Sequence, residues 1–359
     1  MAAVCVAAAC TAIAWTPVHA QSTVAELNDA GWKALRDGNG RKAETLFAEA
    51  LALRPDDAVL MFGAGAAAHV EGHQRDAMAH LQRALEVNPR LTPASQLLGR
   101  IAYGEGDVDL AIRTYEQALK MTPNNAAMAR ELEAWRKETS VHSTFEARKY
   151  DRFRVMFEGR AEESLALQAT TILDSAFRRI GDTLGEYPSE TIVAVLYTEK
   201  QFRDITRAPQ WSGALYDGRI RVPAAGASQE PALFARVLTH ELTHAVIANI
   251  VPPRTCPTWL NEGLAQHFEG ADPEAARRRM KTLGGRIPLK DLSNGFMSMS
   301  AATARVAYDE SLLAVEVMFD RPGFGWTRLL HRLADGQTFE QAIVNFGFSY
   351  ADLEAPFTK

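Results

Sequence analysis

The spacing of hydrophobic residues divides the chain into a helical first part and a mixed second part. In the first part, the segments AEALALRPDDA, QRALEVNPRLT and EQALKMTPNNA each indicate a helix that ends in a proline-containing turn. In the second part, apolar and polar residues alternate over 151–158, which predicts a half-buried strand, and residues 161–183 have a helical pattern. The short, β-branched apolar run at 191–198 predicts a buried strand. These patterns indicate an all-α part followed by an α+β part.

The first part repeats itself every 34 residues. Proline, alanine, glycine and large apolar residues all recur at this interval, namely Pro55, Pro89 and Pro123; Ala50, Ala84 and Ala118; Ala43, Ala77 and Ala111; Gly31, Gly65 and Gly99; and Phe47, Leu81 and Tyr115. Small residues let paired helices approach closely, and proline ends a helix because it lacks the amide donor. The period resembles the tetratricopeptide repeat. It implies three such repeats over residues 21–125, followed by a capping helix and a polar linker over residues 126–149.

Arrays of this family usually bind peptides or partner proteins in a concave groove. By the family's pattern, the residues that could line it are Asn28, Trp32, Phe62, His69, Arg100 and Tyr103. Ordinary packing between helices is the alternative for each of them, because aromatic residues at helical spacing are usually part of a core. The resemblance therefore implies a protein or peptide partner without identifying the contacts.

The second part contains a group of residues typical of metal chemistry. Residues 240–244 read His240-Glu241-Leu242-Thr243-His244, inside an apolar helical segment that has no breaker before Pro252. On a helix, the two histidines lie one turn apart on one face and can bind the same tetrahedral ion. Glu241 lies beside that face, where it can reach water on the metal without being a ligand. This is the HExxH pattern of zinc peptidases.

The sequence that follows the HExxH motif indicates which class of metallopeptidase the chain resembles. Residues 245–251 lack the glycine and third histidine that a metzincin requires. A second helix with the sequence TWLNEGLA follows instead, and it carries Glu262. The combination of HELTHAVI and PTWLNEGLA resembles the peptidase MA-like family of gluzincin metallopeptidases. The resemblance implies a thermolysin-like α+β metallopeptidase domain over residues 150–359, with His240, His244 and Glu262 holding one Zn²⁺ ion.

The resemblance also implies a mechanism. Zinc makes water nucleophilic at neutral pH, and Glu241 is expected to accept its proton and deliver it to the leaving amine. Residues 306–311 resemble the family's downstream tyrosine segment, which implies that Tyr308 stabilises the oxyanion, with His331 in reserve. The alternative for Tyr308 is a packing role. The strand at 219–222 is expected to lie at a sheet edge, where it could pair with an extended substrate or remain unpaired.

Charge and composition limit the partners. The 359 residues suffice for two domains, and a net charge of -5 argues against nucleic acid as a partner. The basic run Arg277-Arg278-Arg279-Met280-Lys281 is therefore expected to be a solvated helix face.

The first twenty residues stand apart from the rest of the chain. They carry no Lys, Arg, Asp or Glu and end in Val18-His19-Ala20, which predicts a signal peptide over residues 1–20. The protein is then exported, periplasmic if bacterial, and keeps no stable membrane span after cleavage; an uncleaved anchor is the alternative. The mature chain would keep a single cysteine, Cys256, and so no internal disulfide.

Two functional hypotheses remain at this point. The first is an exported zinc metallopeptidase with a docking array. The second is a non-enzymatic tetratricopeptide scaffold in the cell envelope, whose metal site is structural or vestigial. Glu241 favours the enzyme, because a structural metal site has no use for a general base.

Overall fold

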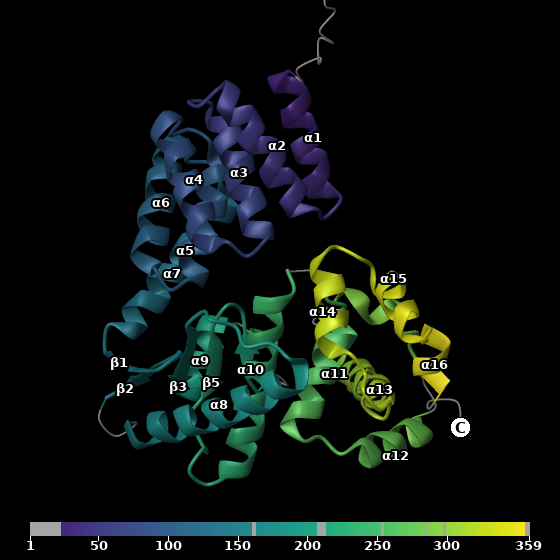
Figure 1. The fold of residues 1–359 in the computed structure, drawn as a ribbon. Helices are drawn as coiled ribbons and strands as arrows, with labels where there is room; N and C mark the ends of the chain where they lie inside the picture. Colours follow the sequence, from purple (N-terminus) through teal and green to yellow (C-terminus); the bar gives the residue numbers. More distant parts are fainter. Residues whose placement is uncertain are drawn as a thin grey trace, which may run out of the picture.

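The computed structural model describes residues 23–159, 163–206, 213–252, 255–283, 286–296 and 299–355. A stack of antiparallel helices is followed by a sheet and a second group of helices (Figure 1). The predicted fold class, a tetratricopeptide-like array followed by an α+β part, is confirmed. The expected signal peptide at residues 1–20 lies outside the described residues. Among the helices that are described, none is both long and apolar enough to cross a membrane.

The array consists of three helical hairpins and a seventh helix. Its helices are α1 (Val24–Arg36), α2 (Gly40–Leu53), α3 (Ala58–Val70), α4 (Gln74–Val87), α5 (Thr92–Gly104), α6 (Val108–Met121) and α7 (Ala126–His142). The glycine series and the large apolar series of the sequence face each other across each hairpin. A Cβ added to Gly31 would lie 2.8 Å from the Phe47 ring, and one added to Gly65 would lie 2.8 Å from Leu81. Glycine is thus required because the paired helix brings a large side chain against its backbone.

The segment expected as a linker is ordered secondary structure, so that part of the prediction is wrong. Helix α7 continues to His142, and residues Phe145–Tyr150 form strand β1. Strand β1 pairs with β2 (Phe153–Glu158) in an antiparallel hairpin, with Phe145 opposite Glu158. The polar composition of this segment suggested a linker, but an edge strand such as β1, whose side chains are at most half-buried, can also be polar.

The sheet has five strands in the order β1-β2-β3-β5-β4. The inner strands β2, β3 (Ile192–Tyr197) and β5 (Ile220–Pro223) are parallel, and the edge strand β4 (Leu215–Tyr216) is antiparallel to β5. The expectation that residues 219–222 form a sheet edge is therefore wrong, because β4 covers that side of β5 at Ile220 and Arg221.

Both faces of the sheet are covered. Ile192, Ala194 and Leu196 of β3 pack with helices α8 (Glu163–Leu184) and α10 (Pro231–Ile250). The alternate residues of β3 pack with α9 (Glu199–Thr206) and the end of α7, in a cluster that includes Val193, Val195, Tyr197 and Phe202. Burial on both faces explains why residues 191–198 read as a continuous apolar run.

The remaining helices pack around α10. They are α11 (Thr258–Glu269), α12 (Pro273–Leu283), η2 (Asp291–Asn294), α13 (Ala301–Phe319), α14 (Trp326–Ala334), α15 (Phe339–Ile343), η3 (Val344–Phe346) and α16 (Tyr350–Glu354). Helices α11 and α13 cross closely at Gly263, where any Cβ would collide with the carbonyl of Ser311.

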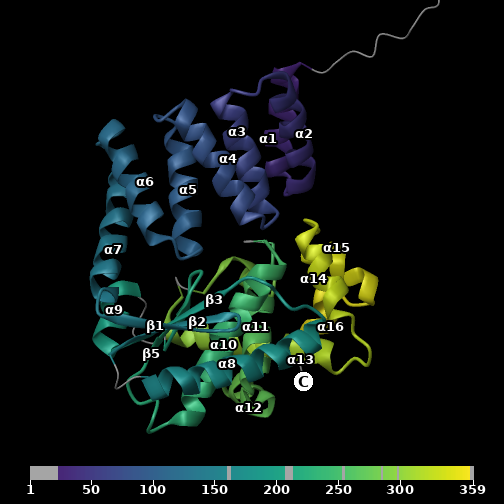
Figure 2. The ribbon, with the colours of Figure 1, turned by 60° about the vertical axis from the view of Figure 1, so that its left-hand side comes forward.

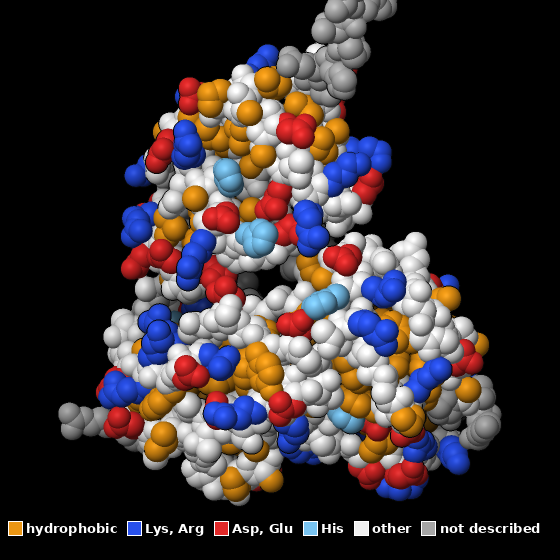
Figure 3. All heavy atoms as spheres, in the orientation of Figure 1, with side chains coloured by type: hydrophobic (Ala, Val, Ile, Leu, Met, Phe, Trp, Pro, Cys, Tyr) orange, Lys and Arg blue, Asp and Glu red, His pale blue; other side chains and the backbone are white. Residues whose placement is uncertain are grey.

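The array meets the second part at two places (Figure 2). At the first, Tyr103 of α5 and Glu138 of α7 bond to Arg219 and Arg221 at strand β5. At the second, a Cβ added to Gly336, after α14, would lie 3.1 Å from a backbone oxygen in the turn after α1. A hollow separates the two contacts in the space-filling view (Figure 3).

Candidate metal and catalytic site

Helix α10 carries the HExxH residues at its middle. Leu238, Leu242 and Val246 are buried in the core, which fixes the rotation of the helix. His240 and His244 therefore emerge together on the opposite side, with ring centroids 4.7 Å apart and ring planes at 85°. Their spacing of one turn places both Nε2 atoms toward helix α11.

Glu262 of α11 completes a three-residue cluster. Its Oε2 lies 3.4 Å from the Nε2 of His240 and 3.5 Å from the Nε2 of His244. The same oxygen is buried and accepts no hydrogen bond within the part of the chain that is described. A tetrahedral zinc ion with bonds of about 2.0–2.1 Å separates its ligand atoms by about 3.3–3.4 Å. The three ligand atoms thus fit a zinc ion, and the orphaned oxygen is what such an ion would satisfy.

The outer nitrogens of both histidines are held by α11. The Nδ1 of His240 lies 3.0 Å from Glu269 Oε2, and the Nδ1 of His244 lies 3.0 Å from Asn261 Oδ1. Acceptors at Nδ1 fix the ring so that Nε2 is left for a metal. Sequence reasoning missed both residues. Their positions, one residue before Glu262 and two helical turns after it, were the available signal.

Close packing of charge shifts the pKa values of the cluster. Burial lowers the pKa of His240, but the carboxylates of Glu262 and Glu269 outweigh it and raise the pKa to about 10. Burial raises the pKa of Glu262, and the two histidines reverse this, so that its pKa falls well below the usual range. The ionisation of the histidines and of Glu262 is therefore mutually dependent.

Glu241 is a buried carboxylate that is not engaged by the protein. It is 7% exposed, and among the described residues nothing hydrogen-bonds to its carboxylate. Burial raises its pKa, and the charges of His240 and His244 act in the opposite direction. A carboxylate without partners beside two metal-type histidines is suited to proton transfer.

His240 and Glu241 line a cleft of about 630 Å³ between helices α10, α11, α12 and α13. Tyr308 of α13 lines it together with His240 and Glu241. Its backbone oxygen accepts a hydrogen bond from Gln266 at 2.7 Å. Its hydroxyl has no hydrogen-bond partner in the described ranges. Burial, followed by the charges of Glu262 and Glu241, raises its pKa, so the hydroxyl keeps its proton and can donate it in a hydrogen bond.

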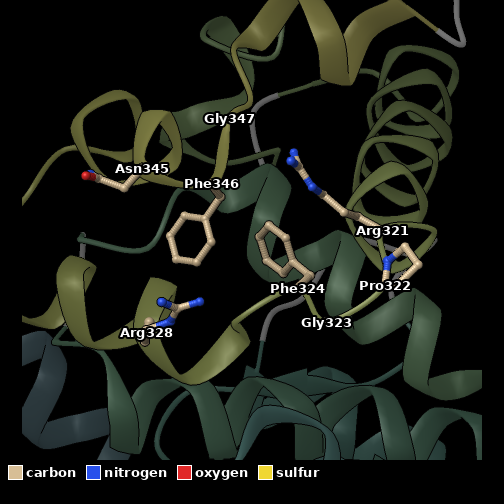
Figure 4. A pocket seen from close by; sticks show the side chains of 8 residues that line it. All are labelled: Arg321, Pro322, Gly323, Phe324, Arg328, Asn345, Phe346 and Gly347. Carbon is tan, nitrogen blue, oxygen red and sulfur yellow. The ribbon is translucent and has the colours of Figure 1, made fainter.

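His331 is not part of this cleft. It lies on α14, with its Nε2 2.6 Å from Glu186, and is half exposed. A second hollow, near α14, is lined by Arg321, Phe324, Arg328 and Phe346 (Figure 4). The Arg328 guanidinium lies over the Phe346 ring, 5.5 Å from its centroid. The described residues that line this second hollow include no His, Asp or Glu. The α10–α13 cleft contains His240 and Glu241 and is therefore the candidate active site.

Comparison with protein families agrees with this division of the chain. The family model of the peptidase MA superfamily matches residues 174–359, more than half of the chain. The chain belongs to the peptidase MA superfamily. A tetratricopeptide-repeat model matches residues 28–95 and 97–132, so the predicted arrangement of repeats and peptidase MA part is confirmed.

The chain was also compared with solved structures and with curated proteins. Among solved structures, the chain is similar to the "First TPR of Spaghetti (RPAP3) bound to HSP90 peptide SRMEEVD", with 20% identity and a TM-score of 0.32, over 33% of this chain and 96% of that one. No curated protein matches the chain. Members of the peptidase MA superfamily are in general metal-dependent, but some are inactive. The chemistry of this member therefore has to be argued from its own residues.

The repeats of this peptidase MA protein divide the six candidate groove residues into two groups. Asn28, Trp32, Phe62 and Tyr103 take part in packing: the Trp32 Nε1 donates to Asn28, its ring lies 5.2 Å from that of Phe62, and Tyr103 stacks on Trp135 and bonds to Arg219 and Arg221. His69 and Arg100 also have partners in the array, Gln74 and Glu131, but they line a cavity of about 370 Å³ whose other wall includes Glu190 and Asn249 of the peptidase MA part. A role for these residues in partner binding stays a prediction.

The basic run on α12 is only partly a solvated face. Arg278 pairs with Asp272 and is exposed, as expected. Arg279 instead forms two hydrogen bonds with Asp309, at 2.6 and 2.8 Å, in the wall of the active-site cleft. Cys256 is free, and burial raises the pKa of its thiol to about 12, so it stays protonated and unreactive.

Proposed function

We propose that the protein is a zinc-dependent peptidase that hydrolyses peptide bonds. The observation that carries the proposal is the convergence of His240, His244 and Glu262 beside the unengaged carboxylate of Glu241. A structural zinc site is usually closed by four protein ligands, whereas a catalytic site has three and an open position. A set of three ligands, with His240 and the neighbouring Glu241 at the wall of a cleft, corresponds to the catalytic type.

The proposed mechanism assigns a role to each side chain around the ion. A zinc ion held by the three ligands would activate water and polarise the substrate carbonyl. Glu241 accepts a proton from the attacking water and passes it to the nitrogen of the leaving amine, so that the C–N bond breaks with a neutral leaving group. The Tyr308 hydroxyl donates a hydrogen bond to the carbonyl oxygen as negative charge develops on it. Glu269 and Asn261 keep the two imidazoles oriented.

We further propose that the array docks a protein or peptide and that the protein is exported. Tetratricopeptide repeats are protein-interaction modules, and here they are fixed to the peptidase MA part at two contacts. We assign residues 21–125 to docking of a protein or peptide and residues 150–359 to catalysis. The uncharged segment 1–20 supports export, to the periplasm if the source is bacterial.

A cleavage experiment tests this function. The purified chain, from which zinc has been removed by a chelator and then restored, is incubated with a mixture of unstructured synthetic peptides, and the products are identified by mass spectrometry. We expect cleavage only with the metal restored. Binding of peptides without any metal-dependent cleavage would support the scaffold instead.

A further inference from the structure

One face of helix α13 forms a wall of the active-site cleft. Its lining residues are Ala301, Ala304, Arg305, Tyr308 and Asp309, spaced as neighbours on one side of a helix. The two alanines are small and leave room in the cleft beside the longer side chains. Arg305 is exposed and lies one turn before Tyr308. On a helix, side chains three positions apart start about 5–6 Å from each other.

Arg305 differs from the other arginines of the cleft. Arg236 donates to Glu269 at 2.7 Å, and Arg279 pairs with Asp309 at 2.6 Å. Their charges are thus neutralised by carboxylates of the cleft wall. Arg305 has no hydrogen bond or ion pair to any residue that the structure describes. Its guanidinium is left with five free donors at the cleft, within reach of a ligand beside Tyr308.

We propose that Arg305 binds a carboxylate of the substrate within one or two residues of the cleaved bond. The inference rests on the proposed function, since it places the scissile carbonyl between the metal ligands and Tyr308. A guanidinium binds a carboxylate through two parallel hydrogen bonds and is always charged, so it selects for this group. The carboxylate comes either from the C-terminus of a peptide or from an Asp or Glu side chain.

The test uses one set of synthetic decapeptides in four matched forms. Their acidic residues are either kept or replaced by Asn and Gln, and their C-termini are either free or amidated. Cleavage rates are measured as kcat/KM for each form, with wild type, Arg305→Gln and Arg305→Glu. Arg154→Gln is the matched control, because it removes the same charge from an exposed position on β2, outside the residues that line the cleft.

We expect wild type and Arg154→Gln to cleave one carboxylate-bearing form about ten- to hundredfold faster than its neutral counterpart. Arg305→Gln should bring this ratio close to one, and Arg305→Glu should invert it. If kcat/KM falls when the C-terminus is amidated, Arg305 binds the α-carboxylate. If kcat/KM falls when Asp and Glu are replaced by Asn and Gln, Arg305 binds an acidic side chain. Equal rates for all four forms with wild type, or an unchanged preference in Arg305→Gln, would overturn the proposal.

A binding measurement separates this inference from the proposed function. Fluorescein-labelled peptides of the four forms are titrated with zinc-loaded Glu241→Gln protein, with and without Arg305→Gln, and followed by anisotropy. If wild type cleaves no peptide but the carboxylate preference in binding disappears with Arg305→Gln, the peptidase proposal fails and the assignment of Arg305 stands. If binding shows no preference that depends on Arg305, the assignment fails whether or not cleavage occurs.

Discussion

Two clusters of buried charge, one at the junction of the array with the sheet and one at the candidate active site, differ in how fully their groups are paired. At the junction, Glu138 is 2% exposed and accepts hydrogen bonds from Arg221 at 2.8 Å and Arg219 at 3.2 Å. Arg221 also donates to Asp217 and to the hydroxyls of Tyr197 and Tyr103. In the described part of the chain, the Nε of Arg219 is the one buried side-chain atom of this junction without a hydrogen-bond partner.

In the candidate active-site cluster, by contrast, buried charged groups are left without partners. The Oε2 of Glu262 is buried without a hydrogen bond, and the carboxylate of Glu241 has no partner in the ranges described. An unpaired buried charge costs stability, so it persists where something outside the chain completes it or where it performs chemistry. The comparison therefore supports our proposals that the junction is architecture and that the α10–α11 cluster is the functional site.

The largest effect on stability is expected at the junction. Arg221→Ala leaves Glu138 buried with only Arg219 as a charged partner, which should lower the free energy of unfolding by about 3–5 kcal/mol. Urea denaturation of the full chain measures this. Arg178→Ala, which breaks an exposed pair with Asp174 on α8, is the control and should cost far less, because water screens exposed pairs. Similar losses for the two variants would contradict an architectural role for the junction.

The junction should also make stability depend on pH. Burial lowers the pKa of His142 from 6.5 to about 4; Glu138 opposes this shift, while Arg219 and Arg221 add to it. As the pH falls, His142 takes up a proton in the unfolded chain before it does so in the folded chain. Its contribution to the free energy of unfolding is therefore complete above pH 6.5 and is lost as the pH falls to about 4. The shift corresponds to roughly 3 kcal/mol. His142→Gln keeps an acceptor for Tyr197 and should flatten the unfolding free energy between these pH values. An unchanged profile would refute the assignment.

A smaller effect is expected around the metal ligands. Asn261→Ala removes the acceptor at the Nδ1 of His244 and should weaken zinc binding about 10- to 100-fold. Competition with a zinc chelator measures the change. Asn249→Ala on α10 is the control, because Asn249 is exposed and its Nδ2 bonds only to a backbone oxygen. Equal zinc affinity in both variants would show that Asn261 does not orient the ligand.

The sequence predicted features that depend on local spacing. Residues 240 and 244 share a face on any helix. The 34-residue series marked Gly31 and Phe47 as repeat positions, and the structure places these two residues against each other within one hairpin. Tyr308 lies in the cleft as its segment implied, while its role remains a prediction.

Features that depend on distant packing were missed. Strand β1 is recognisable only through its pairing with β2. Arg219 and Arg221 alternate with apolar residues, which is the pattern of a solvated face, but α5 and α7 of the array cover that face. Edge positions, such as that of the two-residue strand β4, depend on strand order, which local patterns do not contain.

The central claim is that the unpaired carboxylate beside the metal ligands is a general base. Glu241→Gln keeps the shape of the side chain but cannot accept a proton, whereas His240→Ala removes a ligand. We therefore measure zinc content and hydrolysis of the peptide mixture for both variants. Glu241→Gln should retain wild-type zinc, about one ion per chain, while hydrolysis falls by about 10²–10⁴-fold; His240→Ala should lose both. Hydrolysis at the wild-type rate by zinc-loaded Glu241→Gln would contradict the account.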